Sequence, residues 1–246
     1  SENVTLTNNG TITVSGTLTN NGTIVDNSTI NGTVSGDVRY PSRVTVSLTQ
    51  GGQSVASVSY GSTVTITATM QRAQTNGINA IAELGYVNFY LGGTDGTLLG
   101  SVNVTTGSNG AYTAALTLND NIWAKGFNIG SNTITADFGG VAGTSGDGLL
   151  NSTGTATLTV TKASQTAPGA PTMSDRTTTS VTLDTISGGQ GTVQYGYTTD
   201  GNTSDYHWQT DTTFNNLQPG TDYIFYARYA GNDYYNESQP STGTSV

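Results

Sequence analysis

Apolar and polar residues alternate along most of the chain, and this spacing predicts β-strands rather than helices. Between residues 43 and 163 the alternating segments are short and are separated by turn residues such as Gly, Asn and Asp. The segments are 43–48, 62–68, 87–91, 98–104, 112–118, 132–138 and 155–160. Short strands at this spacing are typical of a β-sandwich, so we predict one over 43–163.

The segment 1–42 repeats a Thr–aliphatic pair at every sixth position. The pairs are Thr5-Leu6, Thr11-Ile12, Thr17-Leu18, Thr23-Ile24 and Thr29-Ile30. A fixed short period with one aliphatic residue per repeat is typical of a β-solenoid, in which Asn and Gly turn the corners. The alternative is a meander of hairpins, because Asn-Gly is also a strong hairpin-turn sequence. We predict a solenoid-like repeat over 1–42 that continues a longer solenoid or stacks on the next domain.

A second sandwich is predicted over residues 172–246, after a linker at 164–171. The linker contains Pro168-Gly169-Ala170-Pro171, which is a stiff and extended sequence. After it, residues 224–229 alternate, and the composition changes: eight of the 13 tyrosines follow residue 167. The predicted fold class is therefore all-β, with a short repeat region followed by two tandem sandwiches.

Several segments of the first predicted sandwich carry a family likeness. Residues 60–68, 85–90 with 98–100, 130–140 and 157–163 resemble the strand signatures of bacterial Ig-like repeat domains. Asn132 stands where that family has a His, and two insertions, at 72–84 and 139–151, depart from its pattern. The resemblance implies an Ig-like sandwich.

The second predicted sandwich resembles a fibronectin type III domain. Its best evidence is Leu217-Gln218-Pro219-Gly220-Thr221-Asp222-Tyr223, which matches the family's tyrosine corner. The resemblance implies that the Tyr223 hydroxyl bonds to upstream backbone, whereas Leu183 stands where the family usually has Trp. The N-terminal repeats resemble those of bacterial adhesins. Together the resemblances imply a segment of a Gram-positive cell-surface protein.

Composition and charge exclude several functions. The chain has no Cys and one His, His207, so it has no disulfide, no thiol nucleophile and no multi-His metal centre. Charged residues are 9% of the chain and the net charge is −9, so nucleic acid is an unfavourable partner. No apolar run approaches the length of a membrane span. We expect no cofactor, no nucleic acid and no membrane insertion of this segment.

The sandwiches contain residues suited to two special chemistries. An intramolecular isopeptide bond would need a buried Lys and a nearby acid, for which Lys125, Lys162 and Glu83 are the available residues. A calcium ion could use the oxygens of residues 119–121, or those of 200, 202 and 205. No metal-binding loop pattern is present, and the carboxylates stand singly without a catalytic partner. We expect solvated lysines, no metal ligands and no catalytic residues.

Aromatic residues are the remaining candidates for a binding site. Tyr206 with Trp208, or Tyr234 with Tyr235, could stack on sugar rings. The alternative is that Trp208 is the family's core tryptophan at a shifted position, which would leave His207 exposed and without a partner.

The sequence therefore predicts a non-catalytic spacer, or stalk, in a bacterial cell-surface or secreted adhesin-like protein. It is expected to be monomeric. The alternatives are a module that binds a glycan or a host surface protein, and accessory domains of an extracellular glycoside hydrolase. The discriminating observation is whether Trp208 fluorescence responds to glycans.

Overall fold

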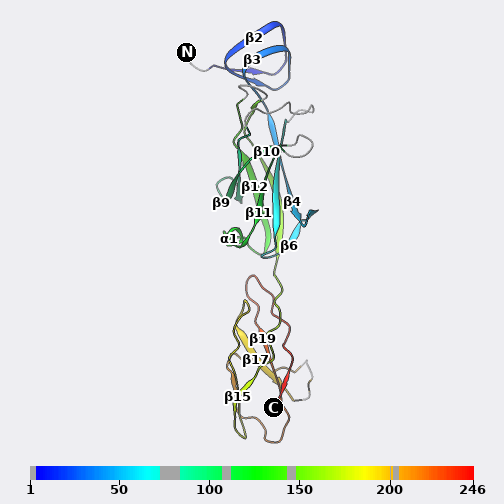
Figure 1. The fold of residues 1–246 in the computed structure, drawn as a ribbon, viewed down its shortest axis with the longest axis vertical. Helices are drawn as coiled ribbons and strands as arrows, with labels where there is room; N and C mark the ends of the chain where they lie inside the picture. Colours follow the sequence, from blue (N-terminus) through cyan, green and yellow to red (C-terminus); the bar gives the residue numbers. More distant parts are fainter. Residues whose placement is uncertain (1–3, 73–83, 107–111, 143–147, 200, 202–204) are drawn as a thin grey trace. The chain divides into compact units, whose positions relative to one another are not determined.

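The computed structural model describes residues 4–72, 84–106, 112–142, 148–199, 201 and 205–246 (Figure 1). These residues belong to two compact units, Ser1–Val160 and Thr161–Val246. Strands dominate both units, and the helix among the described residues is the four-residue α1 (Asp120–Trp123). This helix is far too short to cross a membrane. The predicted all-β fold class is confirmed.

The N-terminal region forms parallel strands, which are β1 (Thr5–Asn8), β2 (Thr11–Asp26) and β3 (Thr29–Tyr40). Thr5 pairs with Thr23, so β1 and β2 are offset by three of the Thr–aliphatic repeats. The alternative of a hairpin meander is wrong, because hairpins pair antiparallel whereas β1–β2 and β2–β3 are both parallel. The parallel register stacks aliphatic residues in columns, and Leu6, Ile24 and Val38 form one of them.

Asparagine side chains hold the corners of these strands. Asn8 accepts a hydrogen bond from the Gly10 amide at 3.0 Å and donates to Asp26 Oδ1 at 2.8 Å. Asn20 accepts from the Gly22 amide at 3.0 Å and donates to the Asp37 carbonyl at 2.9 Å. Each Asn thus closes its own turn and bonds to the neighbouring strand, which explains why Asn recurs at positions 8 and 20.

The first sandwich has two five-stranded sheets. One contains, in spatial order, β10 (Thr105–Thr106), β11 (Tyr112–Leu118), β7 (Val64–Arg72), β4 (Ser42–Gln50) and β5 (Gln53–Ser54). The other contains β6 (Ser57–Ser59), β14 (Ser152–Thr161), β12 (Gly130–Phe138), β8 (Tyr86–Leu91) and β9 (Thr97–Asn103). The core lies between the sheets and includes fully buried side chains from both, such as Val64, Ile66, Phe89, Ile134 and Leu158. A short strand, β13 (Gly148–Leu149), pairs in parallel with the end of β3.

The second sandwich is smaller, with two three-stranded sheets. One contains β15 (Met173–Arg176), β16 (Val181–Leu183) and β18 (Thr213–Phe214), and the other β17 (Val193–Thr198), β19 (Ile224–Tyr229) and β20 (Thr244–Ser245). Its core includes Leu183, Tyr195, Phe214, Phe225 and Ala227. This arrangement is a fibronectin type III-like sandwich.

Tyrosine hydroxyls fasten the loops of the second sandwich. The Gln218 amide donates to Tyr223 Oη at 2.8 Å, so the predicted tyrosine corner is present. The Ile186 amide donates to Tyr195 Oη at 2.8 Å in the same manner. Both rings are buried, with 8% and 3% exposed.

The second unit begins before its first strand. The Ala163 amide donates to the Tyr234 carbonyl, and the Asn236 amide donates to the Ala163 carbonyl, both at 2.9 Å. Gln165 donates to the Asn236 carbonyl at 2.7 Å and accepts from the Gln190 amide at 2.7 Å. Residues 163–165 are therefore fastened to the second sandwich. The boundaries 1–42, 43–163, 164–171 and 172–246 remain sequence predictions.

Candidate functional site

Two of the candidate aromatic residues, Tyr206 and Trp208, lie along the edge of strand β17. Residues 206–209 run beside β17, because Tyr195 and Gln209 exchange two backbone hydrogen bonds of 2.8 Å and the His207 amide donates to the Tyr197 carbonyl at 3.2 Å. Side chains alternate along an extended segment. Tyr206 and Trp208 consequently lie on the outer face of the sheet, and His207 lies on the other side with Tyr197.

Four side chains gather on that outer face, and we call Tyr206, Trp208, Tyr226 and Arg228 the outer aromatic cluster. The ring centroids of Tyr206 and Trp208 are 4.8 Å apart, and those of Tyr206 and Tyr226 are 5.0 Å apart in an edge-to-face arrangement. The Arg228 guanidinium carbon is 4.4 Å from the Trp208 ring centroid, which is a cation–π contact.

Gly196 makes room for the indole. A Cβ at this position would lie 2.6 Å from Trp208 Cε3, so the Trp208 ring packs directly against the β17 backbone. The indole thus has backbone, Tyr206 and Arg228 as neighbours. A sugar that stacks on Trp208 must displace or share one of these contacts.

Arg228 is held in place from two further directions. Its Nε donates to Gln194 Oε1 at 2.8 Å, and its Nη1 lies 3.2 Å from Glu237 Oε2. Glu237 is largely exposed, so this ion pair contributes little stability. Its effect is to orient the guanidinium over the indole.

Burial in the cluster changes the acidity of one phenol. The pKa of Tyr206 is raised above its ordinary value, first because burial disfavours the phenolate and second because of the neighbouring Tyr226 phenol. Tyr206 is therefore a neutral hydrogen-bonding and stacking group at physiological pH. The cluster offers aromatic faces, two phenols and a guanidinium, without a nucleophile–base pair.

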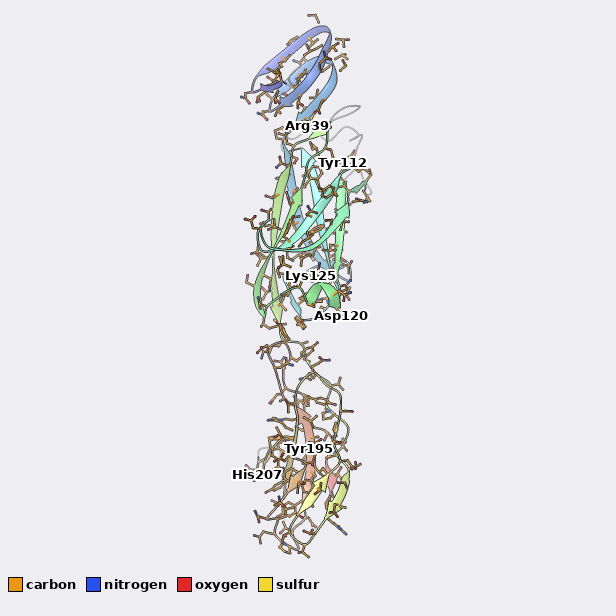
Figure 2. All side chains as sticks on the ribbon, turned by 90° about the vertical axis from the view of Figure 1, so that its left-hand side faces the viewer. Arg39, Tyr112, Asp120, Lys125, Tyr195 and His207 are labelled. Atoms are coloured by element: carbon orange, nitrogen blue, oxygen red, sulfur yellow. The ribbon has the colours of Figure 1, made fainter. Side chains whose placement is uncertain are left out.

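The alternative prediction that Trp208 is a core tryptophan at a shifted position is wrong. Trp208 is half-buried on the outer face of the sheet and does not belong to the buried core of the second sandwich. His207 is exposed as expected (Figure 2). It nevertheless has a partner, because its ring stacks on Tyr197 with centroids 5.0 Å apart. The unexpected partner results from the pairing of residues 206–209 with β17.

Tyr234 and Tyr235 lie on a different element, the loop after β19. Both are half-buried, and both of their amides donate to Asn232 Oδ1 at 2.9 Å. The structure therefore joins Tyr206 to Trp208 and places Tyr234-Tyr235 in a separate turn. Whether either pair binds a ligand stays a prediction.

Sequence reasoning missed Gly196, Tyr226 and Arg228. Tyr226 and Arg228 are two residues apart in a strand, which puts them on one face. Gly196 stands between two large tyrosines, which was a sign that something packs closely there. The missing information was which segment lies beside β17.

The other candidate residues occupy ordinary surface positions. Lys125 is exposed (Figure 2) and donates to the carbonyls of Leu98 and Leu99 at 3.0 and 2.9 Å. Lys162 is exposed and donates to the Asn232 carbonyl. Asn119 caps α1 by accepting from the Ile122 amide. Glu83, Asp200 and Asn202 lie outside the described residues. Within the described ranges no group of three or more His, Asp or Glu residues could hold a metal ion.

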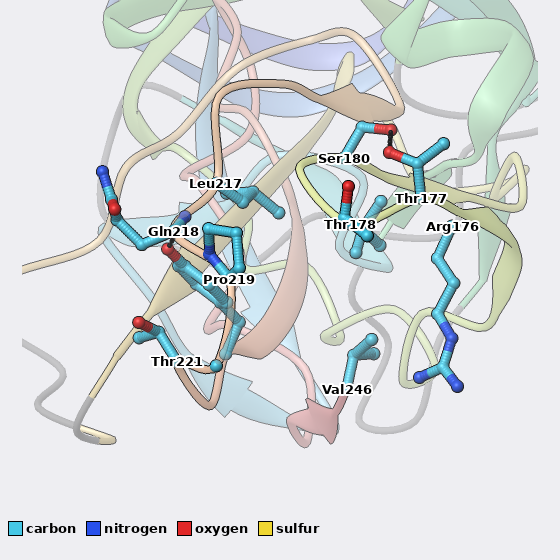
Figure 3. Close-up of a pocket in the computed structure, with 12 residues that line it drawn as sticks. Arg176, Thr177, Thr178, Ser180, Leu217, Gln218, Pro219, Thr221 and Val246 are labelled. Carbon is cyan, nitrogen blue, oxygen red and sulfur yellow. Dashed lines mark hydrogen bonds between the residues drawn. The ribbon is translucent and has the colours of Figure 1, made fainter.

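A cavity of about 310 Å³ opens beside the tyrosine corner (Figure 3). Leu217, Gln218 and Pro219 lie on one side of it, and Arg176 and Thr177 lie on the other. Arg176 and Thr177 are exposed, and the described residues that line the cavity include no acid–base pair.

Comparison with known proteins gives structural likeness alone. No protein-family model and no curated protein matches the chain. Among solved structures, a two-domain fibronectin type III segment of chicken tenascin is 15% identical, covers 74% of this chain and 91% of its own, and has a TM-score of 0.31. Chicken CNTN1 FN1–FN3 domains are 16% identical, with 87% and 69% coverage and a TM-score of 0.30. Titin domains A168–A170 are 15% identical, with 88% and 68% coverage and a TM-score of 0.26.

Proposed function

We propose that this chain is a non-catalytic spacer in a modular bacterial cell-surface or secreted protein, with the segment 1–42 acting as a β-solenoid. The observation that carries the proposal is that each sandwich receives the chain at one end and releases it at the other. The bacterial, adhesin-like setting rests on the sequence resemblances.

The second sandwich illustrates this chain path. Its entry segment is bonded to the loop after β19, through Ala163 and the backbone of Tyr234 and Asn236. Its exit is bonded to the residue before β19, because the amide of Val246 donates to the Tyr223 carbonyl at 3.0 Å. Entry and exit therefore lie at opposite ends of β19.

The first sandwich has the same property. Its entry lies beside the start of β14, because the Ser42 hydroxyl donates to the Leu150 carbonyl at 2.7 Å. Its exit is the end of β14, at Val160. Since β14 runs from Ser152 to Thr161, entry and exit are separated by nearly a full strand of roughly 30 Å.

A module with this path is loaded along its strands when it is pulled from its two ends, so we expect inter-strand hydrogen bonds to break before it extends. The test is to pull the full chain from its two ends in a single-molecule force measurement. We expect separate force peaks for the two units. The second unit, Thr161–Val246, should release roughly 280–310 Å of chain, less its folded length. Extension without a resolved peak would contradict the spacer proposal.

A binding module for a glycan or a host surface protein is the second candidate, and the outer aromatic cluster favours it. Half-buried aromatic rings with an oriented guanidinium suit the flat face of a sugar ring. The test is a glycan panel read by Trp208 fluorescence in the Trp123→Phe variant, since Trp123 is buried in the first unit. Binding that isothermal titration calorimetry confirms, that Trp208→Phe weakens and that Tyr235→Phe leaves unchanged would support this candidate. No response to any glycan at millimolar concentration would remove sugars as its ligand.

A further inference from the structure

We propose that the open edge of β1 is a stacking site for a further coil of the same Thr–aliphatic repeat, running parallel to β1 in the same polypeptide. This inference concerns the first region alone; it rests on the β-solenoid part of the proposed function and not on the spacer role.

The edge itself is the first observation. β1 pairs with β2 on one side, through bonds such as the one from the Thr23 amide to the Val4 carbonyl at 3.1 Å. No described strand lies on its other side, where an edge strand presents its remaining amides and carbonyls. Because backbone groups alternate in direction along a strand, those of Thr5 and Thr7 face this side.

Burial changes abruptly at this edge. Leu6 belongs to the same aliphatic column as Ile24 and Val38, which are 2% and 8% exposed. Leu6 is 50% exposed and Val4 is 71% exposed. They flank a groove of about 310 Å³ that Leu18, Asn20 and Ile24 also line. The column thus ends in an exposed aliphatic side chain beside an apolar groove.

The glycines supply an independent observation. At Gly22 a Cβ would lie 2.2 Å from the Val4 carbonyl oxygen, so the neighbouring coil requires glycine there. Gly10 and Gly16 precede it at the spacing of the repeat. At both of these positions a Cβ would meet no described atom within 4 Å, and φ is outside the left-handed range. Neither turn geometry nor packing therefore explains why these two positions are glycine. A further coil would explain them if it stacked on β1 in the way that β1 stacks on β2, because it would then leave no room for a Cβ.

The occupant follows from the direction of the existing ladders. Both ladders of this region are parallel, and a coil from the same chain continues them in register with the aliphatic columns. A second copy of the chain meeting β1 edge to edge by two-fold symmetry would run antiparallel and would not continue the columns. The far edge of β3 is covered at Arg39 and Tyr40 by β13, which disfavours head-to-tail addition of a copy.

The experiment adds such a coil to the full chain. A duplicate of the segment 5–22 is inserted between Val4 and Thr5, which preserves the offset that pairs Thr5 with Thr23. The matched control inserts the same amino acids in an order that breaks the Thr–aliphatic period. Amide exchange of Thr5 and Thr7 is measured by NMR in the parent chain and in both insertions, and Gly16→Ala and Gly22→Ala are made in each background.

We expect exchange at Thr5 and Thr7 to slow by about tenfold or more in the duplicated chain alone. Gly16→Ala should leave amide exchange unchanged in the parent chain and should reverse the added protection in the duplicated chain. Gly22→Ala should speed amide exchange throughout the first region in both chains. Three results would overturn the proposal. Exchange at Thr5 and Thr7 could stay unchanged on duplication, the duplicated region could lose its protection altogether, or Gly16→Ala could be harmless in both backgrounds. Sedimentation of the parent gives a further check: a dimer that Leu6→Asp dissolves would show that a second copy is the occupant and would also overturn it.

Discussion

The tyrosine corner of the second sandwich offers the sharpest stability prediction. Tyr223→Phe removes one hydroxyl and leaves the Gln218 amide without the acceptor now 2.8 Å away. A net hydrogen bond is worth about 0.5–1.5 kcal/mol, and a buried donor without a partner costs about 1–3 kcal/mol. Gln218 is exposed, so water can replace part of the lost bond. We therefore expect the unfolding free energy of this unit to fall by about 1–2 kcal/mol, between these two limits.

The assay is urea unfolding of the full chain, followed by pulsed hydrogen exchange and mass spectrometry. With a urea dependence of about 1 kcal/mol/M for a unit of this size, the midpoint of peptides from β18 and β19 should fall by about 1–2 M. Peptides from β7 and β12 in the first unit should keep their midpoint.

Two matched variants decide the interpretation. Tyr195→Phe removes an equivalent bond from the Ile186 amide to a buried phenol, so its cost should be similar. Tyr86→Phe alters a ring that is 53% exposed in the first unit, so it should change nothing in the second unit. If Tyr223→Phe behaves like Tyr86→Phe while Tyr195→Phe is destabilising, the corner bond does not stabilise the sandwich and the reasoning is refuted.

Three further predictions concern the second unit. Gln165→Ala removes the hydrogen bonds that Gln165 donates to the Ala230 and Asn236 carbonyls and the one that it accepts from the Gln190 amide. It should therefore lower the free energy of unfolding in urea by about 1–2 kcal/mol and speed exchange of the Ala163 and Asn236 amides. The control Thr166→Ala changes an exposed side chain and should do neither. In Gly196→Ala the added Cβ would overlap the Trp208 indole. This variant should therefore lower the free energy of unfolding by about 1–3 kcal/mol and shift Trp208 emission to the red. Unaltered emission would mean that the indole does not pack against residue 196. The pKa of Tyr206 is raised in the folded protein, mainly by burial. The stability that this raised pKa contributes is fully present below the ordinary tyrosine pKa of about 10, and it is lost as pH rises through the pKa of the folded state. Tyr206→Phe should therefore show a smaller fall in urea midpoint above pH 10 than the parent, and identical pH profiles would refute this.

Much of the fold could be predicted because its strands carry their own period. Alternation located most strands of the first sandwich but only β19 of the second, where the Leu217–Tyr223 motif identified the tyrosine corner and its hydroxyl bond. The N-terminal repeat indicated one inward aliphatic per unit. It did not say how many repeats make one turn of the chain, because that depends on how sharply the Asn and Gly corners bend.

The candidate site was predicted less completely. Alternation does put Tyr206 and Trp208 on one side of their segment, but it does not say which face of the sandwich that is. The face depends on the pairing of residues 206–209 with β17, which is a contact between segments without a sequence signature. The same pairing gives His207 its unexpected partner in Tyr197 and brings Arg228 over the Trp208 ring.

The central claim is that each sandwich receives the chain at one end and releases it at the other, and distances between spin labels test it most directly. The chain has no Cys, so pairs of introduced cysteines can be labelled without background. In the first sandwich the pair Arg43/Thr159 should span about 20 Å and the control Arg43/Thr153 should be clearly shorter, because most of β14 separates Thr153 from Thr159. In the second, Ser164/Ser245 should also span about 20 Å along β19, with Ser164/Asn236 as the short control. Test pairs as short as their controls would contradict the account, because entry and exit would then share one end.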